Sequence, residues 1–311
     1  MRFYDSLDAV PAGFGPSAVT IGKFDGVHAG HRRVITELRD VADAAGLTAT
    51  VVTFDRNPMS LIRPDDCPDA LLSNAQKVEL LAEVGVDATL MLSFDRQFSA
   101  QSPEEFVRRI LVEALHARVV LVGLDFRFGA QGAGSVSRLR ELGAIHGFDV
   151  RLVDEVRPRD DRRTSSTWIR ELLTEGRVGE AAELLGHLPT IRSVVVRGAQ
   201  RGREFGYPTA NLSPAIEGFI PADGVYAAWL GVDGTRYPAA VSIGNNPTFD
   251  GVPDKQVEAH ALDQVFELYG KSVEVSFIGY IRPMLKFDDV DSLIAQMKDD
   301  ESRVREIFAR L

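Results

Sequence analysis

The chain has 311 residues, a formal net charge of −10 at pH 7 and a single cysteine, Cys67. Its length fits two domains of ordinary size, and its apolar fraction of 45% excludes a collagen-like or disordered chain. The acidic balance disfavours a nucleic-acid partner, which needs a continuous basic face. A lone cysteine forms no intramolecular disulfide and is typical of a reducing compartment.

The first residues contain no basic stretch followed by a long apolar run, and no apolar run approaches the length that spans a bilayer. We therefore expect a cytoplasmic protein without a membrane partner. The oligomeric state stays open, and a homo-oligomer is one alternative.

The first half of the chain alternates short apolar runs with amphipathic stretches, which is typical of an α/β fold with a parallel, Rossmann-like sheet. The pattern predicts strands over 17–24, 48–54, 88–94, 119–126 and 149–156, and helices over 31–46, 75–84, 102–116 and 135–146. Two short helices are predicted within 166–176 and 178–186.

The breaker sequence from Gly186 to Pro189 predicts a domain boundary, with domains over 1–186 and 187–311. From Arg192 onward, short alternating segments are separated by glycine, proline and asparagine turns, which predicts a small, mainly antiparallel β-barrel. A helix that begins near Asp288 is predicted to close the chain.

The first strand-to-helix junction reads GKFDGVHAGH over 22–31. Unpaired N–H groups at a helix N-terminus attract anions, and Gly26 and Gly30 let a phosphate approach the main chain. His28 and His31 lie three residues apart and can face the same phosphate oxygens. Two ordinary surface histidines remain an alternative, and a zinc site lacks further ligands at a suitable spacing.

Two further segments are predicted at the same edge of the sheet, VGLDFRFG over 122–129 and TSSTWIR over 164–170. The hydroxyls of 165–167 can bind phosphate oxygens, and the guanidinium of Arg170 suits a polyphosphate. Ordinary capping of the helix by these hydroxyls is the alternative.

The segments GKFDGVHAGH, TFDRNP, VGLDFRFG and SSTWIR, in this order, resemble the FMN adenylyltransferase module of prokaryotic bifunctional FAD synthetases, members of the H-x-G-H nucleotidyltransferase superfamily. The resemblance covers nearly all of 1–186. It implies that FMN attacks the α-phosphorus of ATP and releases pyrophosphate, with His28 and His31 steadying the reacting phosphorus.

The same resemblance implies that Ser166, Thr167 and Arg170 hold the ATP phosphates. It also implies a set of residues that line the nucleotide and flavin pockets: Gly22, Phe24, Asp25, Asn57, Asp125 and Arg127. Asn57 stands where many members of the family have histidine, and Asp125 where some have asparagine, which puts details of the pocket in question rather than the reaction.

In the second half, the segment 197–212 carries three glycines ahead of the sequence Pro-Thr-Ala-Asn. Thr209 and Asn211 are two residues apart, so on a strand their side chains share a face and their oxygens could bind Mg²⁺. An ordinary polar turn is the alternative. Further on, Glu258 alternates with Val257 and Ala259, and it is either a general base or a solvated surface residue.

PTAN over 208–211, GVYA over 224–227, GNNPTF over 244–249, the Glu258 segment and 267–287 together resemble riboflavin kinase. The resemblance implies a six-stranded Greek-key barrel with a terminal helix. It implies that Thr209 and Asn211 bind Mg²⁺ and ATP phosphates, and that Glu258 activates the ribityl 5′-hydroxyl. Gly198 and Gly206 permit close approach of the backbone to a phosphate, and Pro208 and Arg282 are further candidates for ATP or flavin contact.

The two resemblances name consecutive steps, riboflavin to FMN and FMN to FAD, with ATP as co-substrate of both. Three rivals stay open: a nucleotidyltransferase for another acceptor, a flavin sensor without turnover, and an RNA-binding barrel. The acidic charge and the lack of an aromatic stripe disfavour the last of these.

Overall fold

The computed structural model describes residues 1–154, 162–197, 207–244, 255–264 and 267–311. The predicted site residues Gly198 and Gly206, and most of the GNNPTF segment, lie outside these ranges. Contacts along the chain divide it into two compact units, Met1–Ser165 and Ser166–Leu311. The division falls ahead of the two short helices that we predicted within 166–186.

The first unit is built on a parallel sheet in the order β1-β4-β3-β2-β5-β6. Its strands are β1 (Arg2–Tyr4), β2 (Ser17–Ile21), β3 (Thr48–Phe54), β4 (Ala88–Leu92), β5 (Ala117–Gly123) and β6 (Asp149–Val153). The chain runs from β2 to β3 on one side and reaches β5 on the other, so the topological switch point lies at the carboxyl end of β2, where such sheets bind ligands.

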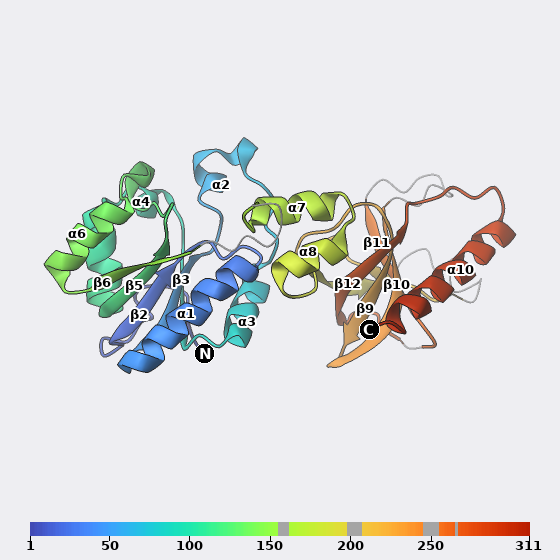
Figure 1. Cartoon of the computed structure of the whole chain (residues 1–311). Coiled ribbons are helices and arrows are strands. Elements are labelled where there is room, and N and C mark those ends of the chain that lie inside the picture. Colours follow the sequence, from blue (N-terminus) through green and yellow to red (C-terminus); the bar gives the residue numbers. More distant parts are fainter. Residues whose placement is uncertain (155–161, 198–206, 245–254, 265–266) are drawn as a thin grey trace. The chain divides into compact units, whose positions relative to one another are not determined.

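Helices cover the sheet, and the main ones are α1 (Ala29–Ala45), α3 (Asn74–Val84), α5 (Pro103–Phe106), the π-helical segment η2 (Val107–Ala114) and α6 (Val136–His146). Figure 1 shows α1 lying across the sheet, where it packs on β2 and β3 and touches α3. Segment η2 and helix α6 pack on each other around a separate core that includes Val19, Leu90 and Leu139. The remaining short elements are α2 (Met59–Ile62), η1 (Pro64–Asp66), α4 (Arg96–Ser99) and η3 (Ala130–Gly132).

The predicted α/β fold class is confirmed, and the strand predicted over 48–54 has those bounds. The strand predicted over 17–24 ends at Ile21, because Phe24 takes a left-handed φ of 48° that extended structure does not contain. Strand β1 carried no sequence signal, since it has only three residues and none of them is fully buried.

The second unit begins with α7 (Ser166–Thr174) and α8 (Val178–Leu185), and α8 packs on β12. Its strands form a closed barrel in the order β10-β11-β8-β7-β12-β9, with antiparallel neighbours throughout. They are β7 (Thr190–Val196), β8 (Ala210–Leu212), β9 (Gly224–Val232), β10 (Thr235–Gly244), β11 (Gln256–Ala261) and β12 (Ser272–Arg282). The predicted barrel is therefore confirmed.

Helix α10 (Val290–Phe308), labelled in Figure 1, is the predicted last helix, and Asp289 is its N-cap. It packs on the barrel through Val304, which forms a small core with Ala227 and Leu262, and through Phe308, whose ring meets Trp229 edge to face at 4.6 Å. Within the part of the chain that the structure describes, no helix is long and apolar enough to cross a membrane.

Candidate active sites

The junction of β2 and α1 places the two histidines at the switch point of the sheet, with His28 just before the helix and His31 in its first turn. His28 is the N-cap of α1, and its Nδ1 accepts the N–H of His31 at 3.3 Å. Gly26 has a φ of 87° and Val27 a φ of 40°. A β-branched residue in that region is strained by roughly 1–3 kcal/mol, and complete burial of the Val27 side chain holds it there. The chain therefore turns sharply here, and this turn places the two imidazole rings next to each other.

The rings of His28 and His31 stack with their centroids 3.6 Å apart, and the ring of Phe24 lies 5.0 Å from that of His31. Burial, reinforced by the positive charge of Arg163, lowers the pKa of His28 to about 4. Burial and the nearby charges of His28, Lys23, Arg163 and Lys77 lower the pKa of His31 well below its usual value. Both rings are therefore neutral at pH 7 and offer N–H donors to an incoming anion.

Two buried polar atoms beside this loop have no hydrogen-bond partner among the described residues, namely Nδ1 of His31 and the hydroxyl oxygen of Thr164. Thr164 is 3% exposed, and its carbonyl oxygen lies next to Gly30, 4.0 Å from where a Cβ would stand. Buried polar groups nearly always have a hydrogen-bond partner. A polar ligand that enters beside this loop would supply that partner to both atoms.

Two further predicted residues of the first unit, Asp25 and Asn57, accept hydrogen bonds from backbone N–H groups. Asp25 accepts the N–H of Leu71 at 2.8 Å, and the side-chain oxygen of Asn57 accepts the N–H of Met59 at 3.2 Å. Gly22 leaves room for the ring of Phe24, which lies 3.1 Å from where a Cβ would stand. These contacts shape the loops after β2 and β3.

Asp125 and Arg127 follow β5, and both are exposed. Asp125 pairs with Arg163 at 2.7 Å, which joins the loop after β5 to the segment before α7. Ser166, Thr167 and Arg170 lie on α7, which belongs to the second unit. Their grouping with His28 and His31 therefore stays a prediction.

Sequence reasoning missed two cations of this site. Lys77 is 7% exposed on α3 and donates from Nζ to the carbonyl of Phe54 at 2.8 Å, and burial lowers its pKa. A lysine on a helix is usually exposed, so the sequence did not indicate that Lys77 is buried at a site. Arg163 lies in a run of charged residues, which is typical of a solvated linker, so the sequence did not point to it either.

A pocket of about 200 Å³ lies at the carboxyl ends of β1 and β4, lined by Ser6, Ser93, Gln101 and Arg109 among others. The side-chain oxygen of Gln101 is buried there without a hydrogen-bond partner among the described residues. None of the predicted site residues lines this pocket.

The second site is carried by the barrel strands β8 and β11, which pair so that Asn211 stands opposite Glu258. Directly opposed residues share a face, and Thr209 lies two residues before Asn211. The Thr209 hydroxyl lies close enough to the Glu258 carboxyl to affect its pKa. Burial raises the pKa of Glu258, and the polar Thr209 hydroxyl opposes that effect. The structure thus brings these three predicted residues together.

The neighbours of Glu258 have the predicted alternation, because Val257 and Ala259 are each 1% exposed and face the core. Pro208 contributes a carbonyl oxygen that accepts a hydrogen bond from His260. Arg282 forms a bidentate pair with the buried Asp300, with nitrogen-to-oxygen distances of 2.8 and 2.6 Å. In this structure the guanidinium of Arg282 therefore links β12 to α10.

The chemistry of Thr209 and Asn211 fits Mg²⁺, because hydroxyl and amide oxygens are hard ligands and this ion keeps several of its ligands from phosphates and water. Among the described residues, no group of three or more histidine, cysteine, aspartate or glutamate side chains could hold a metal by itself. A cation that arrives with ATP phosphates is what this pair of oxygens suits.

Comparison with known proteins assigns both halves. The FAD synthetase family model matches residues 12–168, and the riboflavin kinase family model matches residues 185–308. Two similar proteins are bifunctional riboflavin kinase/FMN adenylyltransferases. That of Listeria monocytogenes is 39% identical, over 94% of this chain and 93% of its own, and that of Escherichia coli K12 is 37% identical, over 93% and 92%.

Among solved structures, one from Streptococcus pneumoniae, described as a macrolide-efflux protein, matches with a TM-score of 0.86 and 32% identity. The match covers 97% of this chain and 98% of that one.

An α/β unit with an H-x-G-H loop at its switch point, joined to a barrel with a carboxylate beside hard oxygen ligands, defines a two-site phosphate-transfer enzyme. The chain belongs to the bifunctional riboflavin kinase/FMN adenylyltransferase family. Its N-terminal part is the FMN adenylyltransferase and its C-terminal part the riboflavin kinase.

Proposed function

We propose that the barrel converts riboflavin and ATP into FMN and ADP, and that the α/β unit converts FMN and ATP into FAD and pyrophosphate. The observation that carries this proposal is the presence of both sites in one chain, where the product of one reaction is the acceptor of the other. Each acceptor brings its own attacking oxygen, so we take both steps as direct in-line transfers without a covalent intermediate on the protein.

In the adenylyl transfer, a phosphate oxygen of FMN attacks the α-phosphorus of ATP and the bond to pyrophosphate breaks. The neutral rings of His28 and His31 donate hydrogen bonds to oxygens whose negative charge grows in the transition state. Ser166, Thr167 and Arg170 hold the remaining phosphates in this proposal. The pockets for the nucleotide and the flavin are lined by Gly22, Phe24, Asp25, Gly26, Asn57, Asp125 and Arg127.

In the kinase reaction, Glu258 accepts the proton of the ribityl 5′-hydroxyl while that oxygen attacks the γ-phosphorus of ATP and ADP leaves. A carboxyl whose pKa is raised by burial is a stronger base than an exposed one. Thr209 and Asn211 would hold Mg²⁺ against the ATP phosphates, where the ion neutralises charge. Gly198, Gly206, Pro208 and Arg282 complete the ATP and flavin contacts in this proposal.

We place the functional boundary after Gly186, with an adenylyltransferase domain over 1–186 and a kinase domain over 187–311. The extents of the two family models, 12–168 and 185–308, support this division. We also propose that the enzyme acts in the cytoplasm on small molecules only, without nucleic acid, and a homo-oligomer stays an alternative for its assembly. Cell fractionation and light scattering of the purified protein test these points.

Incubation of the protein with riboflavin, ATP and Mg²⁺, followed by chromatography over time, tests the proposal. We expect FMN to appear first and FAD after it, and we expect a chelator to abolish both products. Flavin binding by folded protein without any conversion would instead favour a sensor.

A further inference from the structure

A histidine that neither reaction uses lies beside the kinase residues. His260 follows Glu258 by two positions on β11, so both side chains project from the same face of the strand. His260 is 8% exposed, which is unusual for a polar side chain unless its hydrogen-bonding atoms are satisfied. Its contacts therefore indicate what it does.

Both ring nitrogens of His260 meet acceptors. Nδ1 lies 2.9 Å from the carbonyl oxygen of Pro208, and Nε2 lies 3.0 Å from a carboxylate oxygen of Glu301. A carbonyl oxygen only accepts, so Nδ1 carries a proton and donates it, and a second proton lies between Nε2 and the Glu301 carboxyl in their hydrogen bond. The ring of Tyr207 packs edge to face against the imidazole at 5.4 Å. The imidazole thus joins the start of the PTAN segment to helix α10.

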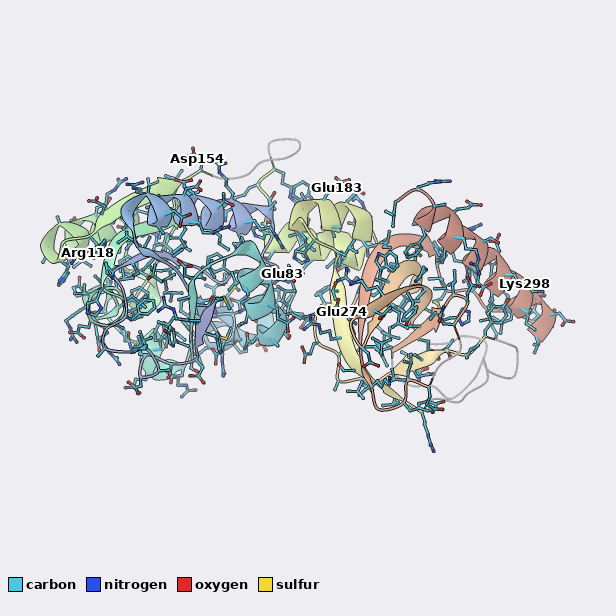
Figure 2. The ribbon with its side chains drawn as sticks, turned by 90° about the horizontal axis from the view of Figure 1, so that it is seen from below. Glu83, Arg118, Asp154, Glu183, Glu274 and Lys298 are labelled. Atoms are coloured by element: carbon cyan, nitrogen blue, oxygen red, sulfur yellow. The ribbon has the colours of Figure 1, made fainter. Side chains whose placement is uncertain are left out.

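The packing of α10 determines where Glu301 stands. Glu301 lies one turn before Val304, which is fully buried in the core between α10 and the barrel. Asp300, its neighbour, is held by Arg282. Lys298 is exposed on the outer side of the same helix, as Figure 2 shows. Because apolar packing and an ion pair hold the helix, Glu301 is a fixed support for the imidazole.

We propose that His260 is a positioning residue of the kinase reaction. By holding the carbonyl of Pro208, it fixes the peptide that leads directly into Thr209, so that Thr209 and Asn211 meet the Glu258 carboxyl and the ATP phosphates in one geometry. This inference rests on the roles proposed above for Thr209 and Glu258. A displacement of about 1 Å in such a group costs roughly 100-fold in rate.

Three substitutions separate the two hydrogen bonds. In His260→Asn, the amide nitrogen of asparagine takes the place of Nδ1 and keeps the hydrogen bond to the Pro208 carbonyl. In His260→Gln, the longer side chain reaches Glu301 and loses the bond to Pro208. His260→Ala loses both hydrogen bonds. We expect kcat/KM for ATP in FMN formation to fall roughly 10- to 100-fold in the alanine and glutamine variants and to stay within about threefold in the asparagine variant.

The same chain supplies the internal control, because FAD formation from added FMN should stay within about twofold in every variant. Glu301→Ala should lower the kinase activity in the same direction. Its matched control is Glu306→Ala on the same helix. The Glu306 side chain is 68% exposed and forms a surface ion pair with Arg310 at 3.9 Å.

Wild-type kinase kinetics in His260→Ala would overturn the inference, as would an asparagine variant no better than alanine. A loss that follows the melting temperature of the barrel across all variants would also overturn it, because it would show a role in stability alone. Glu258→Gln, measured in parallel, separates the role of Glu258 as base from the role of His260 in positioning Thr209. Full kinase activity in Glu258→Gln would refute the proposed base. The ranking of the His260 variants by KM for ATP would still report on the position of Thr209.

Discussion

The imidazoles of His28 and His31 lie face to face, 3.6 Å apart with an interplanar angle of 17°. Two imidazolium cations would repel each other strongly at that distance in a buried site. The lowered pKa values of both rings remove this conflict, since neutral rings stack without a charge penalty. Each ring remains able to donate one hydrogen bond, which is what a phosphoryl group that gains charge needs.

Removal of either ring should therefore affect one activity only. We expect His28→Ala and His31→Ala to lower kcat for FAD formation by roughly 100- to 1,000-fold, the cost of losing a preorganised donor. FMN should still accumulate from riboflavin at the wild-type rate. His146→Ala, at the exposed end of α6, is the matched histidine control, and parallel loss of both products in a folded variant would refute the independence of the two sites.

Acid should destabilise the first unit through His28. The unfolded histidine takes up a proton below a pH of about 6.5 and the folded one only below about 4, so the unfolded state binds more protons between these values. The free energy of unfolding should rise with pH across that window, by up to about 3 kcal/mol from this group. Unfolding by urea at several pH values measures it, and His28→Gln should show a shallower slope than the wild type.

Glu258→Gln should remove the proposed base from the kinase site. We expect kcat for FMN formation to fall roughly 100- to 10,000-fold, while FAD formation from added FMN is unchanged. Because burial raises the pKa of Glu258, the acid limb of the wild-type pH profile should lie above the usual range of a glutamate. Glu274→Gln is the control, since that barrel carboxylate, labelled in Figure 2, pairs with Arg192 at 2.8 Å.

Gly26 and Gly46 provide a matched pair for the histidine loop. Both have left-handed φ values, 87° and 63°, so alanine at either position should cost about 1–2 kcal/mol of stability. Gly46 ends α1 in open space, whereas Gly26 shapes the loop that holds His28. We expect only Gly26→Ala to raise KM for ATP in FAD formation by more than tenfold, and an equal change in Gly46→Ala would contradict this assignment.

Asp300→Asn should leave the Arg282 guanidinium buried without its charge partner, because these side chains are only 6% and 12% exposed. Breaking such a pair costs about 3–5 kcal/mol. Thermal unfolding of the barrel should show this loss, and Asp299→Asn should not, since the Asp299 side chain is 52% exposed and pairs with Arg303 on the surface. If Arg282 contacts flavin directly, as the resemblance implies, Arg282→Met should also raise KM for riboflavin.

Much of the fold followed from local patterns. The alternation of 48–54 and the amphipathic 31–46 predicted the strand and helix that flank the H-x-G-H loop, and Gly46 ended that helix as predicted. Local patterns missed β1, which is held by pairing with β4 rather than by burial of its own side chains.

The amino-acid sequence by itself determined the order of the main elements after β1, the two classes of domain and the motifs that hold His28, His31, Thr209, Asn211 and Glu258. Periodicity, turn residues and motif spacing are local properties of a chain. The tertiary structure alone decided that Lys77 is buried near His31, that Asn211 stands opposite Glu258 and that His260 joins Pro208 to Glu301. Those relationships depend on strand order, register and the packing of α10, which arise from contacts between residues far apart along the chain.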